Sequence, residues 1–259
     1  MANAAQLPRT SPDIALAVRG LRKAFGALIA TDDLDLDVAR NECHALIGPN
    51  GAGKTTLLAQ LAGELAPDRG SILFGERDVT RLGPDARARL GIARSFQITT
   101  LVDEFTAEDN VALAVQARHA TVMRFWRSAF TDHTLRDPAR AALARVGLSE
   151  RANVRASDLA HGEQRLLELA IALAQEPAVL LLDEPMAGLG HDESRAMIAL
   201  LRSIKRTVTM LLVEHDMDAV AQLADRVTVL VAGRAIAAGD YDTIRNDARV
   251  RDAYLGEQG

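Results

Sequence analysis

One run of residues, between an apolar segment and a helix-like one, carries the clearest chemistry in this sequence. It reads Gly-Pro-Asn-Gly-Ala-Gly-Lys-Thr-Thr and fits the pattern of a phosphate-binding loop. The glycines let the backbone turn tightly and bring its N–H groups against phosphate oxygens. Lys54 can reach the β- and γ-phosphates, and the hydroxyl of Thr55 can bind Mg²⁺. The helix that follows points its positive end at the same anion, so the sequence predicts binding of a nucleoside triphosphate. The candidate phosphate-binding residues are Gly48, Pro49, Asn50, Gly51, Ala52, Gly53, Lys54, Thr55 and Thr56.

A second candidate element is a pair of adjacent carboxylates at the end of a buried segment. Residues 180–182 are all leucine and run directly into Asp183 and Glu184. In phosphate-loop enzymes an acid at such a strand end holds Mg²⁺, directly or through water, which makes Asp183 a candidate ligand. Glu184 is a candidate to orient or deprotonate the attacking water. Most Asp-Glu pairs after an apolar strand are solvated turns, but the phosphate loop upstream favours the functional interpretation here.

Two further polar residues are candidates because of where they fall in the chain. His215 follows a strand-like segment, 210–213, and Glu214. Ligands of open α/β sheets gather at such strand ends, so we interpret His215 as a γ-phosphate contact and an organiser of the attacking water. A lone histidine is more often a structural residue. Gln97 precedes a helical segment, where its amide oxygen can complete the Mg²⁺ shell and couple nucleotide state to rotation of that segment.

The elements that must position these residues follow from hydrophobic periodicity. Residues 33–38 alternate strictly between acidic and apolar side chains, as in a strand with one buried face. Short apolar runs at 44–47, 179–182 and 209–213 are typical of buried strands, and helical patterns alternate with the later ones. Between 101 and 159 almost all of the signal is helical, which predicts an inserted helical subdomain.

These patterns define the expected fold class: α/β, with a phosphate-loop NTPase core built on a mainly parallel sheet, an antiparallel β lobe near the N-terminus and an inserted α-helical subdomain. We expect a flexible tail at 1–12 and a nucleotide-binding domain at 13–259. In that domain, 13–98 and 160–259 form the ATPase core with the β lobe, and 99–159 form the helical subdomain. The remaining predicted elements are strands at 71–74, 226–231 and 234–237 and helices at 54 to about 65, 111–120, 122–129, 138–146, 164–174, 193–204 and 218–223.

Composition excludes several classes of protein. The 259 residues carry a net charge of −5, and nucleic-acid binding usually requires an excess of Lys and Arg. The longest apolar runs have the length of a strand and are too short to cross a bilayer. Cys43 is the only cysteine, so a disulfide within the chain is impossible. The first residues contain no apolar signal core, and we expect a cytosolic protein.

With these elements in order, the chain resembles the ATP-binding-cassette (ABC) family along nearly its whole length. The resemblance rests on the phosphate loop, Gln97, Asp183-Glu184, His215 and a signature segment after Leu159. It implies two nucleotide domains that enclose two ATP molecules, each between one protomer's phosphate loop and the other's signature segment. It also implies that Phe25 stacks on adenine, where the alternative is a plain core position. The implied signature residues are Ala160, His161, Gly162 and Glu163.

The chain departs from the family pattern at two places. The usual signature is Leu-Ser-Gly-Gly-Gln, and Ala160 lacks the serine hydroxyl that reaches the γ-phosphate across the dimer. Backbone N–H groups around Gly162 can still face the anion. The turn after Glu184 has Gly190 where the family commonly has aspartate. Lys54, Asp183 and Glu184 remain, so hydrolysis is still expected.

The same segments resemble the larger ATP-binding subunit of branched-chain amino-acid importers. They are Ala-His-Gly-Glu-Gln-Arg, Asp-Glu-Pro-Met-Ala-Gly-Leu, Val-Glu-His-Asp-Met and the ending Ala-Tyr-Leu-Gly. The resemblance implies an ATPase with Mg²⁺ as metal cofactor on the cytoplasmic face of the cell membrane. Its implied partners are integral-membrane permease subunits, a second ATP-binding subunit and, indirectly, a solute-binding protein, with no nucleic acid.

In this hypothesis the catalytic residues are Lys54, Glu184 and His215, and the metal ligands are Thr55, Gln97 and Asp183. ATP binding closes the dimer and hydrolysis resets it. The alternatives are a cassette of the lipopolysaccharide-export type and a soluble ATP-binding switch with little hydrolysis. A soluble regulator acting on nucleic acid or ribosomes is disfavoured by the single phosphate loop and the acidic charge.

Overall fold

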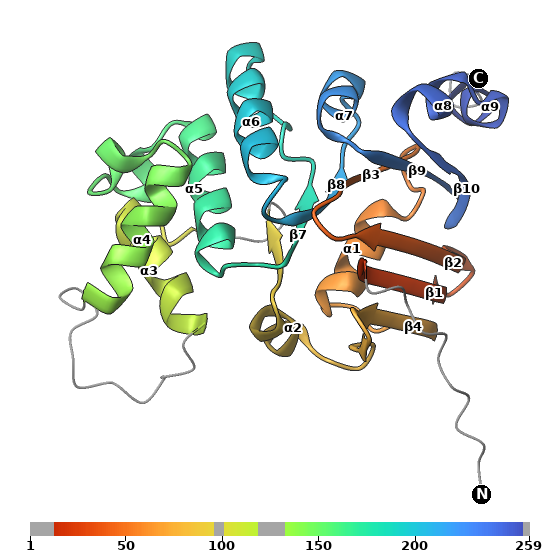
Figure 1. The fold of residues 1–259 in the computed structure, drawn as a ribbon, viewed down its shortest axis with the longest axis horizontal. Helices are drawn as coiled ribbons and strands as arrows, with labels where there is room; N and C mark the ends of the chain where they lie inside the picture. Colours follow the sequence, from red (N-terminus) through yellow and green to blue (C-terminus); the bar gives the residue numbers. More distant parts are fainter. Residues whose placement is uncertain (1–12, 96–100, 119–132, 256–259) are drawn as a thin grey trace, which may run out of the picture.

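The computed structural model describes residues 13–95, 101–118 and 133–255 (Figure 1). Three predictions therefore lie outside the described residues: the tail at 1–12, the helix at 122–129 and Gln97. In the described residues the chain forms two sheets, with helices on both faces of the larger one. No helix in these ranges is long and apolar enough to span a bilayer.

The first sheet is antiparallel and lies near the N-terminus, as predicted. Its strand order is β2-β1-β4-β5, formed by β1 (Ile14–Phe25), β2 (Leu28–Ala39), β4 (Arg69–Phe74) and β5 (Arg77–Asp78). In β2 the three apolar side chains of the alternating segment are buried and the three aspartates between them are exposed. β1 was not predicted, because register shifts along its pairing with β2 interrupt the regular alternation of its side chains.

The second sheet carries the strand ends on which the predicted chemistry depends. Its order is β10-β9-β3-β8-β7-β6. The five strands other than β10 are parallel to one another, so their carboxyl ends meet at one edge, and β10 is antiparallel to β9. The strands are β3 (Cys43–Ile47), β6 (Ile92–Ser95), β7 (Val179–Asp183), β8 (Thr209–Val213), β9 (Arg226–Val231) and β10 (Arg234–Gly239).

Strand β7 shows why the parallel strands read as unbroken apolar runs. Leu181 belongs to the core on one face of the sheet, where α1 (Lys54–Ala62) packs. Leu180 and Leu182 belong to the core on the other face, with α5 (His161–Ala174) and α6 (His191–Ile204). Because both faces are covered, alternate side chains are equally buried and no polar position is needed.

The helical segment packs beside the sheet through α5. Helices α3 (Ala107–Arg118) and α4 (His133–Arg145) contact each other and α5 (Figure 1). Both begin before their predicted first residues, at 111 and 138, because helix boundaries are weakly encoded by periodicity. The remaining helices are α2 (Pro84–Leu90), α7 (Met217–Leu223), α8 (Tyr241–Asn246) and α9 (Ala248–Leu255).

The helix after the phosphate loop is shorter than predicted. It was expected to reach about Leu65, and α1 ends at Ala62. Gly63 adopts a left-handed conformation with φ of 83°, and its N–H donates to the Gln60 carbonyl oxygen at 3.2 Å. A glycine in this conformation is a common helix terminator, so the leucine periodicity continues past the end of the helix.

Candidate functional site

The phosphate loop connects β3 to α1 at the carboxyl edge of the parallel sheet. Two of its glycines are required by their surroundings. A side chain at Gly48 would place Cβ 2.0 Å from the Leu230 carbonyl oxygen, and one at Gly53 would place it 1.9 Å from the Ala30 carbonyl oxygen. Gly53, with φ of 100°, is also the N-cap of α1, so the free N–H groups of the first helical turn begin at the loop.

Lys54 is held against the loop that precedes it. Its Nζ donates to the carbonyl oxygens of Gly48 at 2.6 Å and Pro49 at 2.8 Å. The residue is only 8% exposed, so the ammonium group occupies the concave side of the loop. These contacts place a cation where the loop's N–H groups and the helix dipole also favour an anion.

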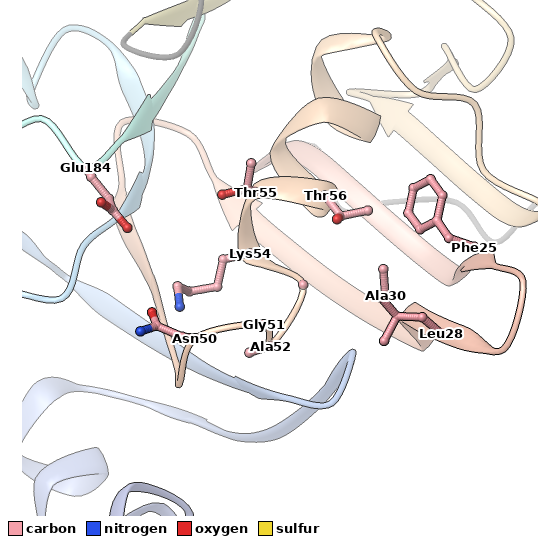
Figure 2. Close-up of a pocket in the computed structure, with 11 residues that line it drawn as sticks. Phe25, Leu28, Ala30, Asn50, Gly51, Ala52, Lys54, Thr55, Thr56 and Glu184 are labelled. Atoms are coloured by element: carbon pink, nitrogen blue, oxygen red, sulfur yellow. The ribbon is translucent and has the colours of Figure 1, made fainter. Parts of the chain in front are cut away.

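A pocket joins the phosphate loop to Phe25 and Glu184 (Figure 2). In the view of Figure 2, Glu184 and Phe25 lie at opposite ends, with Lys54 and Thr55 between them. Half of Phe25 is exposed, which contradicts the alternative of a plain core residue. Sequence analysis did not identify Leu28 and Ala30 of β2, which also line this pocket, because the residue pattern of that strand carries no sign of ligand binding. The pocket is lined by Phe25, Leu28, Ala30, Asn50, Gly51, Ala52, Gly53, Lys54, Thr55, Thr56 and Glu184.

Asp183 ends β7 and turns toward the neighbouring strand β6. Its Oδ2 accepts a hydrogen bond from Nη2 of Arg94 at 2.9 Å, and Arg94 also pairs with Glu64. Burial raises the pKa of Asp183, and the hydrogen bond from Arg94 opposes that effect. Sequence reasoning missed Arg94, because its pairing with Asp183 depends on the sheet order.

Glu184 and His215 come together from the ends of adjacent strands. Nδ1 of His215 lies 3.9 Å from Oε1 of Glu184, and both side chains are substantially exposed. The Glu184 N–H donates to the Val213 carbonyl oxygen at 2.9 Å, which joins the turn after β7 to β8. Glu184 has a φ of 50°, in the left-handed region that residues other than glycine rarely adopt.

The signature segment does not reach the pocket of its own chain. Ala160 is the N-cap of α5, and its N–H donates to Oε2 of Glu163 at 3.0 Å. That hydrogen bond, followed by the ion pair with Arg151, lowers the pKa of Glu163. The segment packs on the first turn of α6: a Cβ at Gly162 would lie 2.4 Å from Oε1 of Glu193.

His161 packs on the turn between β7 and α6. Its Nε2 would be 3.0 Å from a Cβ at Gly188, which has a φ of 76°.

The structure brings together Phe25, the phosphate loop and Glu184 in one pocket, with His215 near Glu184 and Asp183 one residue away. It leaves residues 160–163 outside that pocket, and Gln97 lies outside the described residues.

Comparisons with known proteins identify relatives that are ATP-binding proteins of transporters. A family model described as ABC transporter matches residues 31–187, and one described as Branched-chain amino acid ATP-binding cassette transporter matches residues 236–259. The chain is 39% identical over 251 residues to the high-affinity branched-chain amino acid transport ATP-binding protein LivG of Salmonella typhimurium, covering 93% of this chain and 98% of that protein. The BraF protein of Pseudomonas aeruginosa, with the same description, is 39% identical over 252 residues with the same coverage.

Among solved structures, the ADP conformation of MJ1267, an ATP-binding cassette of an ABC transporter, is similar over nearly the whole fold. Its TM-score is 0.84 with 26% sequence identity, covering 94% of this chain and 99% of that one. The likeness confirms the predicted fold class, including the antiparallel lobe and the helical insertion.

A phosphate loop at the edge of a parallel sheet, with an acidic strand end two strands away, is characteristic of the phosphate-loop NTPases. The chain belongs to the ABC transporter family, as an ATPase subunit of the branched-chain amino acid transport group. It is thus an ATP-binding cassette that forms one part of a transporter complex.

Proposed function

We propose that this chain is the ATP-hydrolysing motor subunit of an importer for branched-chain amino acids or related small hydrophobic or amide solutes. The branched-chain amino acid transport function of LivG and BraF, and the family model that matches residues 236–259, support this cargo class. The observation that carries the proposal is the pocket that joins the phosphate loop to Glu184. The cargo is inferred from the relatives, because the cassette does not itself contact it.

The nucleotide is proposed to lie along the pocket from Phe25 to Glu184. Phe25 offers an exposed ring for stacking on adenine, and replacing it with alanine removes about 1–3 kcal/mol of stacking. Lys54 and the first amides of α1 neutralise and hydrogen-bond the phosphates. Lys54 would exchange its contacts with Gly48 and Pro49 for contacts with phosphate oxygens.

Mg²⁺ is proposed to bind between the Thr55 hydroxyl and the Asp183 carboxylate, with Gln97 as a third protein ligand. Hydroxyl, carboxylate and amide oxygens are the donors that Mg²⁺ prefers. The described residues contain no group of three or more His, Cys, Asp or Glu side chains able to hold a metal ion. A site with so few protein ligands fits an ion that takes its other oxygens from water and ATP, and whose charge offsets that of the phosphates.

For hydrolysis, Glu184 is proposed to orient and deprotonate the attacking water, and His215 to hold the γ-phosphate and water in line. Their 3.9 Å separation lets one water or phosphate oxygen contact both side chains. Lys54 would stabilise the charge on the transferred phosphoryl group.

The second half of each ATP site is proposed to come from another cassette. Residues Ala160, His161, Gly162 and Glu163 lie outside the pocket of their own chain, and the first turn of α5 leaves backbone N–H groups for an external anion. A dimer, formed by two copies or with a second ATP-binding subunit, would supply this segment to ATP. The remaining proposed partners are the membrane permeases, which hold the cassette on the cytoplasmic face, and a solute-binding protein.

The proposed roles predict a specific result for Glu184→Gln. Turnover of ATP should fall at least about a hundredfold, because the general base is lost, while binding of ATP persists. Steady-state phosphate release and equilibrium binding of a fluorescent ATP analogue measure the two quantities. Glu150→Gln makes the same charge change at an exposed position and should leave both unchanged. Equal turnover in Glu184→Gln and the unmodified chain would overturn the catalytic assignment.

Cargo and direction are tested by uptake of radiolabelled leucine into cells of the source organism. Deletion of the gene should abolish high-affinity uptake, the unmodified gene should restore it, and the Glu184→Gln gene should not. Normal uptake after deletion would overturn the importer proposal. Intact ATPase activity in the purified subunit would then leave the export-type alternative. Tight ATP binding without turnover would identify the soluble switch.

A further inference from the structure

The carboxylate of Glu214 binds two separate turns of the chain at once. The residue follows β8 and is only 1% exposed. Its Oε1 accepts a hydrogen bond from the Met186 N–H at 2.9 Å. Its Oε2 accepts from the N–H groups of His215 at 3.0 Å and Asp216 at 3.2 Å. Both oxygens are thus engaged, each by a different segment.

The two segments are those that carry the proposed catalytic side chains. Met186 lies two residues after Glu184, in the turn that leaves β7, and His215 begins the turn that leaves β8. Glu184 adopts a φ of 50°, a conformation that costs free energy and persists only where other contacts hold it. The hydrogen bond from Met186 is one of the contacts that hold this turn in place, together with the bond between the Glu184 N–H and Val213.

Three backbone N–H donors converge on this one side chain from two turns. Such donors favour the ionised form of a carboxylate. Burial acts in the opposite direction and is the larger effect, so the pKa of Glu214 is raised although the hydrogen bonds from the three amides lower it. Outright replacement of the carboxylate by an apolar group would leave buried N–H groups without a partner.

We propose that Glu214 is a positioning residue for ATP hydrolysis, which fixes the turn of Glu184 to the turn of His215 so that both side chains face the same γ-phosphate. The inference rests on the proposed catalytic roles of those two residues. Glu214 itself lies behind the two turns and does not line the pocket. Its effect is on the relative placement of the two groups, which sit 3.9 Å apart.

Glutamine is the informative replacement, because it keeps the shape of the side chain and removes one acceptor. Its amide group has one oxygen and one NH₂, and an NH₂ cannot accept a hydrogen bond from a backbone N–H. Glu214→Gln must therefore lose either the link to Met186 or the links to His215 and Asp216. In both cases the two turns are no longer joined through this side chain.

Steady-state kinetics on the purified chain tests the proposal. In Glu214→Gln, kcat should fall about tenfold or more, while KM and the Kd of a fluorescent ATP analogue stay within about twofold. The matched control is Glu108→Gln on α3, a carboxylate equally buried at 1% exposure and paired with Arg136 and Arg140. That variant should lower the melting temperature without changing kcat. If both variants lower Tm alike and neither changes kcat, Glu214 is only structural and the proposal is wrong.

A combined variant separates this inference from the proposed function. If Glu214 acts only through Glu184 and His215, adding Glu214→Gln to a variant that already carries Glu184→Gln and His215→Gln should reduce turnover no further, because residues that act as a unit are not additive. A further tenfold loss in that background would contradict the positioning role. If Glu184→Gln alone retains full turnover, the proposed catalytic role of Glu184 is wrong, independently of the result for Glu214. If Glu214→Gln does not fold, Glu214→Asp keeps the charge, is one methylene shorter and should show the same loss of kcat with unchanged ATP affinity.

Discussion

Arg94 and Asp183 join two neighbouring strands of the parallel sheet by an ion pair of 2.9 Å at the strand end where Mg²⁺ is proposed to bind. Both side chains are largely buried, at 9% and 3% exposure. The same guanidinium group also pairs with Glu64 from the segment after α1. A positive charge therefore balances the proposed metal ligand and couples its position to β6.

Replacing Arg94 with methionine should destabilise the fold by about 3 kcal/mol, because it leaves the buried Asp183 carboxylate without its cation. Urea denaturation followed by circular dichroism measures the change in the free energy of unfolding. Arg195→Met removes an exposed pair with Asp192 and serves as the control, with no measurable change expected. If the free energy of unfolding falls no more in Arg94→Met than in Arg195→Met, the pair of Arg94 and Asp183 does not contribute to stability.

Two glycines of the phosphate loop should respond differently to alanine. Gly51→Ala adds a Cβ into open space at a φ of 74°, and the strain of the left-handed conformation should cost about 1–2 kcal/mol. Gly53→Ala places the same atom 1.9 Å from the Ala30 carbonyl oxygen, so the loop must move and ATP binding should be lost. Urea denaturation and binding of a fluorescent ATP analogue compare the two. Equal affinity for ATP in both variants would contradict the geometry.

Ala160→Ser should stabilise the chain by about 1 kcal/mol. Ala160 is the N-cap of α5 in an extended conformation, where a serine oxygen can accept an N–H of the first helical turn. Glu163 already accepts the Ala160 N–H, so serine would complete a capping box. Thermal unfolding measures the gain. Ala160→Val has no acceptor and should show none, so an equal rise in both variants would refute the capping explanation.

Cys43 should be inert in the folded chain. Burial raises the pKa of its thiol to about 12, with Asp225 acting in the same direction. Iodoacetamide at about pH 8.5 should alkylate it only after unfolding, because the thiolate is the reactive form. Mass spectrometry with and without urea tests this, and rapid labelling of the native chain would contradict the burial.

The same shift has a consequence for stability at alkaline pH. The unfolded chain releases the thiol proton near pH 9.0, whereas the folded chain retains it up to about 12. The folded state then binds more protons than the unfolded state, so this group makes the chain less stable as pH rises through that window. Cys43→Ala should show a smaller decline of melting temperature from about pH 8.5 to 10.5.

Short motifs indicated the residues of the candidate site, whereas neither motifs nor periodicity indicated the buried residues that contact them. Lys54, Glu184 and the parallel strands could be inferred because glycine spacing, strand-end acids and apolar runs are local signals. The roles of Arg94 and Glu214 could not, since each depends on which strands are neighbours in the sheet. Their types and sequence positions are unremarkable until the order β3-β8-β7-β6 is known.

The limits of helices and strands were also difficult to predict from hydrophobic periodicity. Gly63 ends α1 although the leucine pattern continues, and the register shifts of β1 hide its alternation. Both effects come from backbone conformation at single residues, to which a hydrophobic period is insensitive.

The place of β3 within the sheet sets the order in which the site can be built during synthesis. Its described neighbours are β8, which begins at Thr209, and β9, which begins at Arg226. The ribosome therefore releases a complete phosphate loop long before the strands that flank it exist, and long-range pairings of this kind form late. A nascent chain can complete the sheet around its phosphate loop only after β9 has been made, by which point Glu184 and His215 have also been synthesised.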